Sequence, residues 1–224
     1  MRLVPAIVLW AVAFAFVEAA VVEYLRAIYY PLTGGGFKFP LHTAEQIRAL
    51  GEEHWRRLLI ELGREAATLV MLAAVGVAAG KSRRERLALF MIAFGVWDIF
   101  YYFWLKLFLD WPLDIMTWDL LFLVPVPWAA PVLAPVLISI ALILSGLIVL
   151  YCESRGCPLN TRAGDWALII FGGFTVIAAF CWDYYNIVNG GHPHSFHWSL
   201  FLVGFVVSAA AFVAVLCRQR TTRT

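Results

Sequence analysis

Residues Leu87 to Leu109 read LALFMIAFGVWDIFYYFWLKLFL, a run of 23 residues in which Asp98 and Lys106 are the only charged side chains. At about 1.5 Å per residue, a helix of this length crosses the hydrocarbon core of a bilayer, which is about 30 Å thick. Asp98 lies at the middle of the run, where a charged side chain costs about 2.5 to 3.5 kcal/mol. Another group in the folded protein must offset that cost, so Asp98 marks a candidate functional site.

The composition of the whole chain is typical of a membrane protein. Of the 224 residues, 62% are hydrophobic and 14% are charged, and the mean hydropathy is +0.81. These values predict an all-α integral membrane protein, a six-transmembrane-helix bundle that forms one domain over residues 1–224. The first apolar run is too long for the core of a signal peptide, so we expect it to be retained. The predicted spans are Leu3 to Tyr24, Leu58 to Gly80, Leu87 to Leu109, Ala129 to Tyr151, Trp166 to Val188 and Trp198 to Cys217.

Basic residues predict the orientation of these helices. Short loops that are rich in Lys and Arg stay on the cytoplasmic side, whereas segments 110–128 and 189–197 contain neither residue. We therefore expect a multi-pass protein of a bacterial-type inner membrane with both termini in the cytoplasm. The basic residues that carry this prediction are Arg2, Lys81, Arg83, Arg84, Arg86, Arg155, Arg162, Arg218, Arg220 and Arg223.

Four acidic residues from four predicted helices are expected in one layer of the membrane. Measured from each helix centre at about 1.5 Å per residue, Asp98 lies at the middle, and Glu65, Glu18 and Asp183 lie about 6, 7 and 9 Å toward the outside. Arg64 is the only strong base predicted near them within a span. Carboxylates in excess of basic partners must take up protons or coordinate cations, so the sequence predicts a site open to the outer side.

The favoured hypothesis for this site is a divalent metal centre, with or without metalloenzyme activity. Carboxylates and imidazoles together suit Zn, Mn or Fe, and three histidines lie within six residues, from His192 to His197. No compact ligand signature such as His-Glu-x-x-His occurs, so the ligands would come from separate segments. The expected ligands are Glu18, Glu65, Asp98, Asp183, His194 and His197.

A second hypothesis uses the acids for proton transfer without a metal. A buried carboxyl group beside aromatic rings could protonate a lipid or isoprenoid substrate that enters from the bilayer. Aromatic faces would stabilise a cationic intermediate. The expected catalytic residues are Asp98, Asp183 and Glu18, and the expected substrate-lining residues are Trp97, Tyr101, Tyr102, Trp182, Tyr184 and Asn186.

Other function classes are weighed against these two. A non-catalytic subunit of a larger membrane complex could bury the same acids against partner chains, and inward convergence of the acids would argue against that role. Ion transport is disfavoured because segments 66–79, 167–179 and 200–216 contain no charge on the cytoplasmic side. The net charge of +2 and the scattered basic loops give no indication of a nucleic-acid partner.

Two outer segments carry local structural signals. In the first outer loop, residues 25–57, Thr43 and Gln46 form a capping-box pattern that predicts a short amphipathic helix over about residues 43–57 at the membrane interface. Residues Leu120 to Pro135 contain four prolines, which suits a re-entrant entry into the fourth span.

Overall fold

The computed structural model describes residues 3–29, 43–49 and 51–221. The chain is mostly helical, with 76% of residues in helices. The helices are α1 (Val4–Tyr29), α2 (Ala44–Ala49), α3 (Glu52–Ala79), α4 (Arg83–Leu109), α5 (Leu133–Ser154), α6 (Ala163–Cys181), α7 (Tyr184–Val188) and α8 (Trp198–Thr221), and the strands are β1 (Trp118–Phe122) and β2 (Trp128–Pro131).

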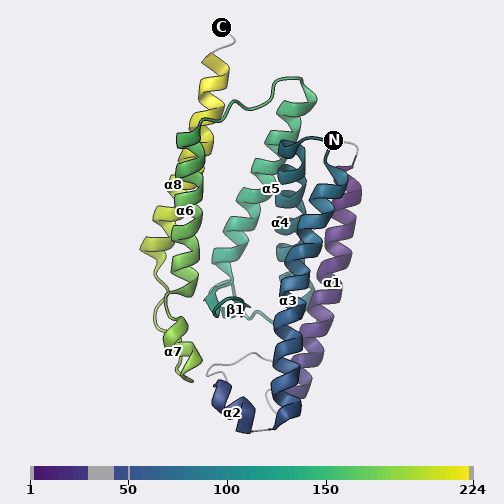
Figure 1. Cartoon of the computed structure of the whole chain (residues 1–224), viewed down its shortest axis with the longest axis vertical. Helices are drawn as coiled ribbons and strands as arrows, with labels where there is room; N and C mark the ends of the chain where they lie inside the picture. Colours follow the sequence, from purple (N-terminus) through teal and green to yellow (C-terminus); the bar gives the residue numbers. More distant parts are fainter. Residues whose placement is uncertain (1–2, 30–42, 50, 222–224) are drawn as a thin grey trace.

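The helices pack in two groups. α1, α3 and α5 each lie against α4, whereas α6 lies against α8 (Figure 1). The groups meet at β2, which contacts both α5 and α6, and in a small contact between α5 and α8. The interface of α1 with α4 is made close by fully buried small side chains, which let helices approach within a membrane. These side chains include Ala11, Ala15, Ala19 and Ala93.

The helices confirm the prediction of a membrane protein. Within the described ranges, five helical segments are long and apolar enough to cross a bilayer: α1, α4, α5, the α6 to α7 segment and α8. α3 is 28 residues long and packs along α4, but its outer half carries charged residues such as Glu61, Arg64 and Glu65. A sixth span therefore stays a prediction, as does the side of the membrane on which the termini lie.

The structure is consistent with the predicted all-α membrane class, and the proline-rich segment before α5 adds a short β-hairpin to it. β1 pairs antiparallel with β2, Trp118 lies opposite Pro131, and the register shifts between Leu120 and Phe122. Prolines lack the backbone N–H that a helix interior needs, so the predicted fourth helix does not begin at Ala129. It begins at Leu133, after the hairpin.

The predicted fifth span is also interrupted. α6 ends at Cys181, Trp182 and Asp183 form a bend, and α7 begins at Tyr184. Sequence periodicity did not reveal this bend because the residues on both sides of it are apolar and aromatic.

The helix expected over residues 43–57 is divided at Gly51. The Thr43 capping box is present. The backbone N–H of Gln46 donates to the Thr43 hydroxyl at 3.1 Å, and the backbone N–H of Thr43 donates to the side-chain oxygen of Gln46 at 2.8 Å. Gly51 adopts a φ of 111°, which ordinary side chains rarely adopt, so α2 stops and α3 starts anew at Glu52. His42 lies outside the described residues.

In each helix group, one glycine allows the backbones of two neighbouring helices to come into close contact. A side chain at Gly95 of α4 would meet the Ser139 carbonyl oxygen of α5 at 2.5 Å. A side chain at Gly172 of α6 would meet the Ser208 hydroxyl and the Gly204 carbonyl oxygen of α8. Glycine at these positions is therefore required for the observed helix separations.

We predict that Gly172→Leu lowers the free energy of unfolding by about 1 to 3 kcal/mol, because the backbone of α8 cannot yield to the added side chain. The control is Gly173→Leu, since a Cβ at this neighbouring helical position meets no atom within 4 Å. Thermal unfolding of both variants in detergent measures the difference. Equal losses of stability in the two variants would contradict the proposed α6 to α8 contact.

Candidate functional site

A large cavity lies between the two groups of helices. Its volume is about 1090 Å³, and it is lined by residues of α1, α3, α4, α5, α6, α8 and the hairpin. Most lining side chains are aliphatic or aromatic, and those contributed by α6 and α8 include no charged residue. Glu18, Glu65 and Asp98 all line this cavity, so three of the four acids expected in one membrane layer do converge.

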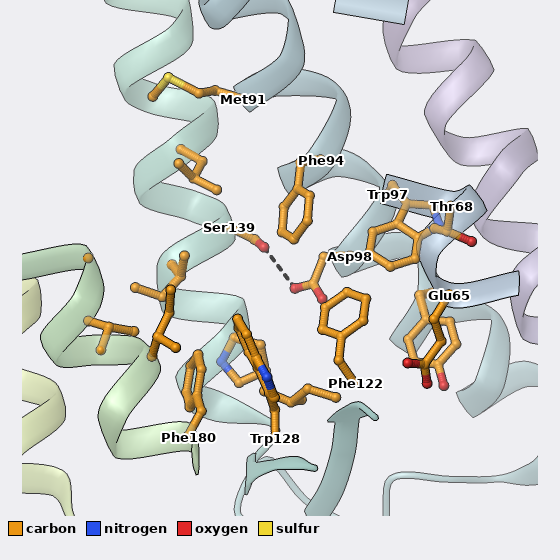
Figure 2. Close-up of a pocket in the computed structure, with 18 of the residues that line it drawn as sticks. Glu65, Thr68, Met91, Phe94, Trp97, Asp98, Phe122, Trp128, Ser139 and Phe180 are labelled. Carbon is orange, nitrogen blue, oxygen red and sulfur yellow. Dashed lines mark hydrogen bonds between the residues drawn. The ribbon is translucent and has the colours of Figure 1, made fainter. Parts of the chain in front are cut away.

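Asp98 projects from α4 into the middle of the cavity wall. The Ser139 hydroxyl of α5 donates a hydrogen bond of 2.7 Å to its Oδ2 atom. Figure 2 shows Asp98 pointing toward Ser139, with the rings of Phe94, Trp97 and Phe122 around the carboxyl group. In the part of the chain that the structure describes, no Lys, Arg or His forms an ion pair with Asp98. A neutral hydroxyl is therefore its polar partner.

The contact with Ser139 exists because α4 and α5 are unusually close. Gly95 lies three residues before Asp98, nearly one helical turn away, and it touches the backbone at Ser139. The hydroxyl of Ser139 is almost fully buried, at 1% exposure. The pair is thus held by the same helix contact that forms this wall of the cavity.

Glu18 and Glu61 are compensated by Arg64. The guanidinium group of Arg64 on α3 donates to Glu18 of α1 and, at 2.5 and 2.9 Å, to Glu61 of α3. The Thr68 hydroxyl donates to the other oxygen of Glu18 at 2.6 Å. This network joins α1 to α3, and the single positive charge of Arg64 is shared by two of the acids that the sequence left in excess.

Glu65 holds the backbone of the hairpin. Its Oε2 atom accepts a hydrogen bond of 2.8 Å from the Leu123 amide, directly after β1. The Glu65 side chain is buried, at 7% exposure. Since an amide can only donate, this contact requires an acceptor at Glu65 and gives the carboxylate a structural role.

A buried ion pair at the hairpin was missed by the sequence analysis. The Arg26 guanidinium lies 3.8 Å from Asp119 and 4.1 Å from the ring centre of Trp111, and the Tyr102 hydroxyl donates to Asp119 at 3.1 Å. Burial raises the pKa of Asp119 to about 6, although Arg26 and Tyr102 oppose that rise. Both charged residues lie in segments that the sequence assigns to outer loops, and only a hairpin prediction would have indicated their burial.

Asp183 lies apart from the cavity. The bend after Cys181 directs its carboxylate to the following loop, where it accepts from the His194 amide at 2.7 Å and lies 2.8 Å from the His194 Nδ1 atom. Asp183, His194, His197 and Trp182 surround a small hollow of about 10 Å³. Asp183 is therefore not a member of the Asp98 site, which corrects the expected grouping of catalytic acids.

The six expected metal ligands are not brought together. Over residues 3–29, 43–49 and 51–221, no three His, Cys, Asp or Glu side chains form a group that could hold a metal ion. Glu18, Glu65 and Asp98 line the cavity with separate partners, and the other three residues surround the small hollow. A metal centre of Zn, Mn or Fe stays a prediction, which elemental analysis of the purified protein tests.

The expected substrate-lining residues divide in the same way. Trp97, Tyr101 and Tyr102 line the cavity. Trp182 and Tyr184 are exposed on the outer segment, at 59% and 42%, and Asn186 donates to the His192 carbonyl oxygen at 2.5 Å. The α4 aromatic residues therefore lie at the cavity, whereas Trp182, Tyr184 and Asn186 lie at the bend and the loop that follow α6.

Two tryptophans of the cavity wall carry buried polar atoms that are relevant to a ligand. The indole Nε1 groups of Trp97 and Trp128 are buried and have no hydrogen-bond partner among the described residues. Leaving a buried donor unpaired costs about 1 to 3 kcal/mol. An oxygen atom on a bound molecule would satisfy such a donor.

The chain was compared with protein-family models, with curated proteins and with solved structures. None of the three comparisons gave a match. The function is therefore inferred from the geometry of the cavity and from the chemistry of the residues that line it.

Proposed function

We propose that this protein binds a lipid-like molecule in the cavity between its two helix groups and acts on it by acid-base chemistry at Asp98. The observation that carries the proposal is a carboxyl group partnered by a neutral hydroxyl, in the wall of a largely apolar cavity of about 1090 Å³ whose other charged residues have partners of their own. Ligand sites commonly have volumes of about 300 to 1,000 Å³ and few polar groups.

The lining of the cavity supports an apolar ligand. An apolar surface gains about 25 cal/mol for each Å² that is removed from water, so an empty or hydrated cavity of this kind is unfavourable. A chain from the surrounding bilayer would fill it with matching chemistry. The unpaired indole donors of Trp97 and Trp128 favour a ligand that also carries an oxygen atom.

The partner of Asp98 supports a role in proton transfer. Arg64 and the Leu123 amide, which bind Glu18 and Glu65, can only donate hydrogen bonds, so neither can accept one from the O–H of a protonated carboxyl group. The Ser139 hydroxyl can donate to a carboxylate and can also accept from a carboxylic acid. Asp98 can therefore keep this contact in both protonation states, which a general acid and base requires.

Asp98 alone could catalyse the isomerisation of a carbon–carbon double bond, in which it both donates and removes a proton. Asp98 adds its proton to a carbon–carbon double bond of the ligand, and the ring faces of Phe94 and Trp97 stabilise the resulting carbocation. The same carboxylate then removes a proton from a neighbouring carbon. The product is an isomer of the substrate, and no oxidant or reductant is consumed.

We also propose the six-span topology, with both termini in the cytoplasm of a bacterial-type cell. The start of α1 and the end of α8 lie at the same end of the bundle (Figure 1), which supports an even number of crossings and hence α3 as the sixth span. The basic loop residues Lys81, Arg84, Arg155 and Arg162 support the cytoplasmic assignment of that end. The inward placement of three acids favours a site within this chain over a non-catalytic subunit role.

We predict that Ala141→Phe reduces the amount of lipid that copurifies with the protein by at least about tenfold, because the ring occupies part of the cavity that Asp98 also lines. Ile140→Phe is the control, since Ile140 is 43% exposed on the same helix and does not line the cavity. Mass spectrometry of lipids extracted from purified protein measures retention. The binding proposal is wrong if both variants retain the wild-type lipid equally.

We predict that Asp98→Asn lowers the yield of any wild-type product by about 100-fold or more, because the amide cannot transfer a proton while keeping a similar shape. Lipids from membranes of cells that produce each variant are compared by mass spectrometry, with Asp110→Asn as the control because Asp110 is an exposed helix cap. Unchanged product in Asp98→Asn, or identical lipids with and without wild-type protein, would refute the catalytic role.

A further inference from the structure

The cavity is longer than one leaflet of a bilayer. On α5, both Pro135 and Val149 line it, and their separation of fourteen residues corresponds to about 21 Å. On α6, Trp166 and Phe180 line it at the same separation, also about 21 Å. Half of a hydrocarbon core is about 15 Å thick. The cavity therefore extends past the bilayer midplane when the helices stand across the membrane.

The arginines of the cavity wall are already engaged by carboxylates. Phosphate groups are typically bound by guanidinium groups that offer their paired N–H donors to the phosphate oxygens. Here each cavity-lining arginine forms an ion pair instead, and the carboxylates that line the wall would repel an anion. The pairs are Arg26 with Asp119, Arg57 with Glu53, Arg64 with Glu18 and Glu61, and Arg84 with Glu153.

We propose that the ligand is an uncharged hydrocarbon chain, longer than one leaflet, that lies parallel to the helices and meets Asp98 at an internal position. This proposal rests on the function proposed above and adds the length and charge of the substrate. The engaged arginines disfavour phospholipids and phosphorylated isoprenoids, and chains that end at the midplane leave the inner part of the cavity unfilled.

The position of Asp98 specifies where along the chain it acts. Ser139, which binds Asp98, lies four residues from Pro135 and ten residues from Val149, or about 6 and 15 Å along α5. A hydroxyl at the outer end of the chain would lie on the side of the hairpin, where Trp128 carries an unpaired donor. The carboxyl group therefore faces an internal carbon of the chain.

The test measures binding of three isoprenoid probes to the full-length protein in lipid nanodiscs. Farnesol is short and uncharged, geranylfarnesol is two isoprene units longer with the same hydroxyl end, and geranylfarnesyl phosphate is long and charged. We expect geranylfarnesol to bind at least about tenfold more tightly than either of the others, because it alone fills the cavity without a buried anion. Equal or tighter binding of farnesol or of the phosphate would overturn the proposal.

A variant that blocks only the inner part of the cavity makes the test independent of general hydrophobicity. Ser145 lines the cavity six residues beyond Ser139, about 9 Å further inward. Ser145→Phe should weaken geranylfarnesol binding at least about tenfold and leave farnesol binding within about twofold of wild type, and Ser145→Ala should change neither. Retained farnesol binding also shows that the variant is folded.

The outcomes separate this proposal from the proposed function. If farnesol binds and Ala141→Phe abolishes that binding, while Ser145→Phe has no effect on geranylfarnesol, the cavity is a ligand site but the long-chain inference is wrong. If none of the probes binds, or if Ala141→Phe affects none of them, both the site and the inference fail.

Discussion

The hydrogen bond from Ser139 to Asp98 is the contact on which the arrangement of the cavity depends. A carboxyl group at this depth must have a polar partner, and the partner lies on α5, so α4 and α5 must be close. Gly95 permits that approach because it has no side chain to separate the two backbones. The same contact leaves α5 facing α6 and α8 across the cavity, and places Asp98 in its wall.

The sequence predicted the long helices well and their interruptions poorly. Run length and apolar composition identify α1, α4, α5 and α8, because a bilayer requires long apolar helices. The interruptions depend on contacts between distant residues: Glu65 binds the backbone at Leu123, and Asp183 binds the loop at His194. Local patterns could not reveal such contacts, so the hairpin and the bend between α6 and α7 were not foreseen.

For the site, the depth of the acidic residues could be predicted from the sequence, but not their direction or pairing. Depth follows from counting residues along a helix, and it correctly grouped Glu18, Glu65 and Asp98 around one cavity. Direction depends on helix rotation and bends, which moved Asp183 to another surface. Pairing depends on packing, as the buried contact of Arg26 with Asp119 shows. Charge excess alone therefore did not indicate which acids have basic partners.

If the protein binds a lipid as proposed, the distribution of charge would also determine how that lipid enters. Among the described residues, the ion pairs of the helices stay within one helix group or join it to its own adjoining loop. None of these pairs joins α6 or α8 to the group of α1, α3, α4 and α5. The α6 and α8 walls of the cavity are uncharged. Separating the groups would break apolar contacts, which lipid chains can replace, and would leave Asp98 with Ser139 intact. The fold would thus keep Asp98 fixed on one side of the cavity and make the uncharged side the easier one to open toward the bilayer.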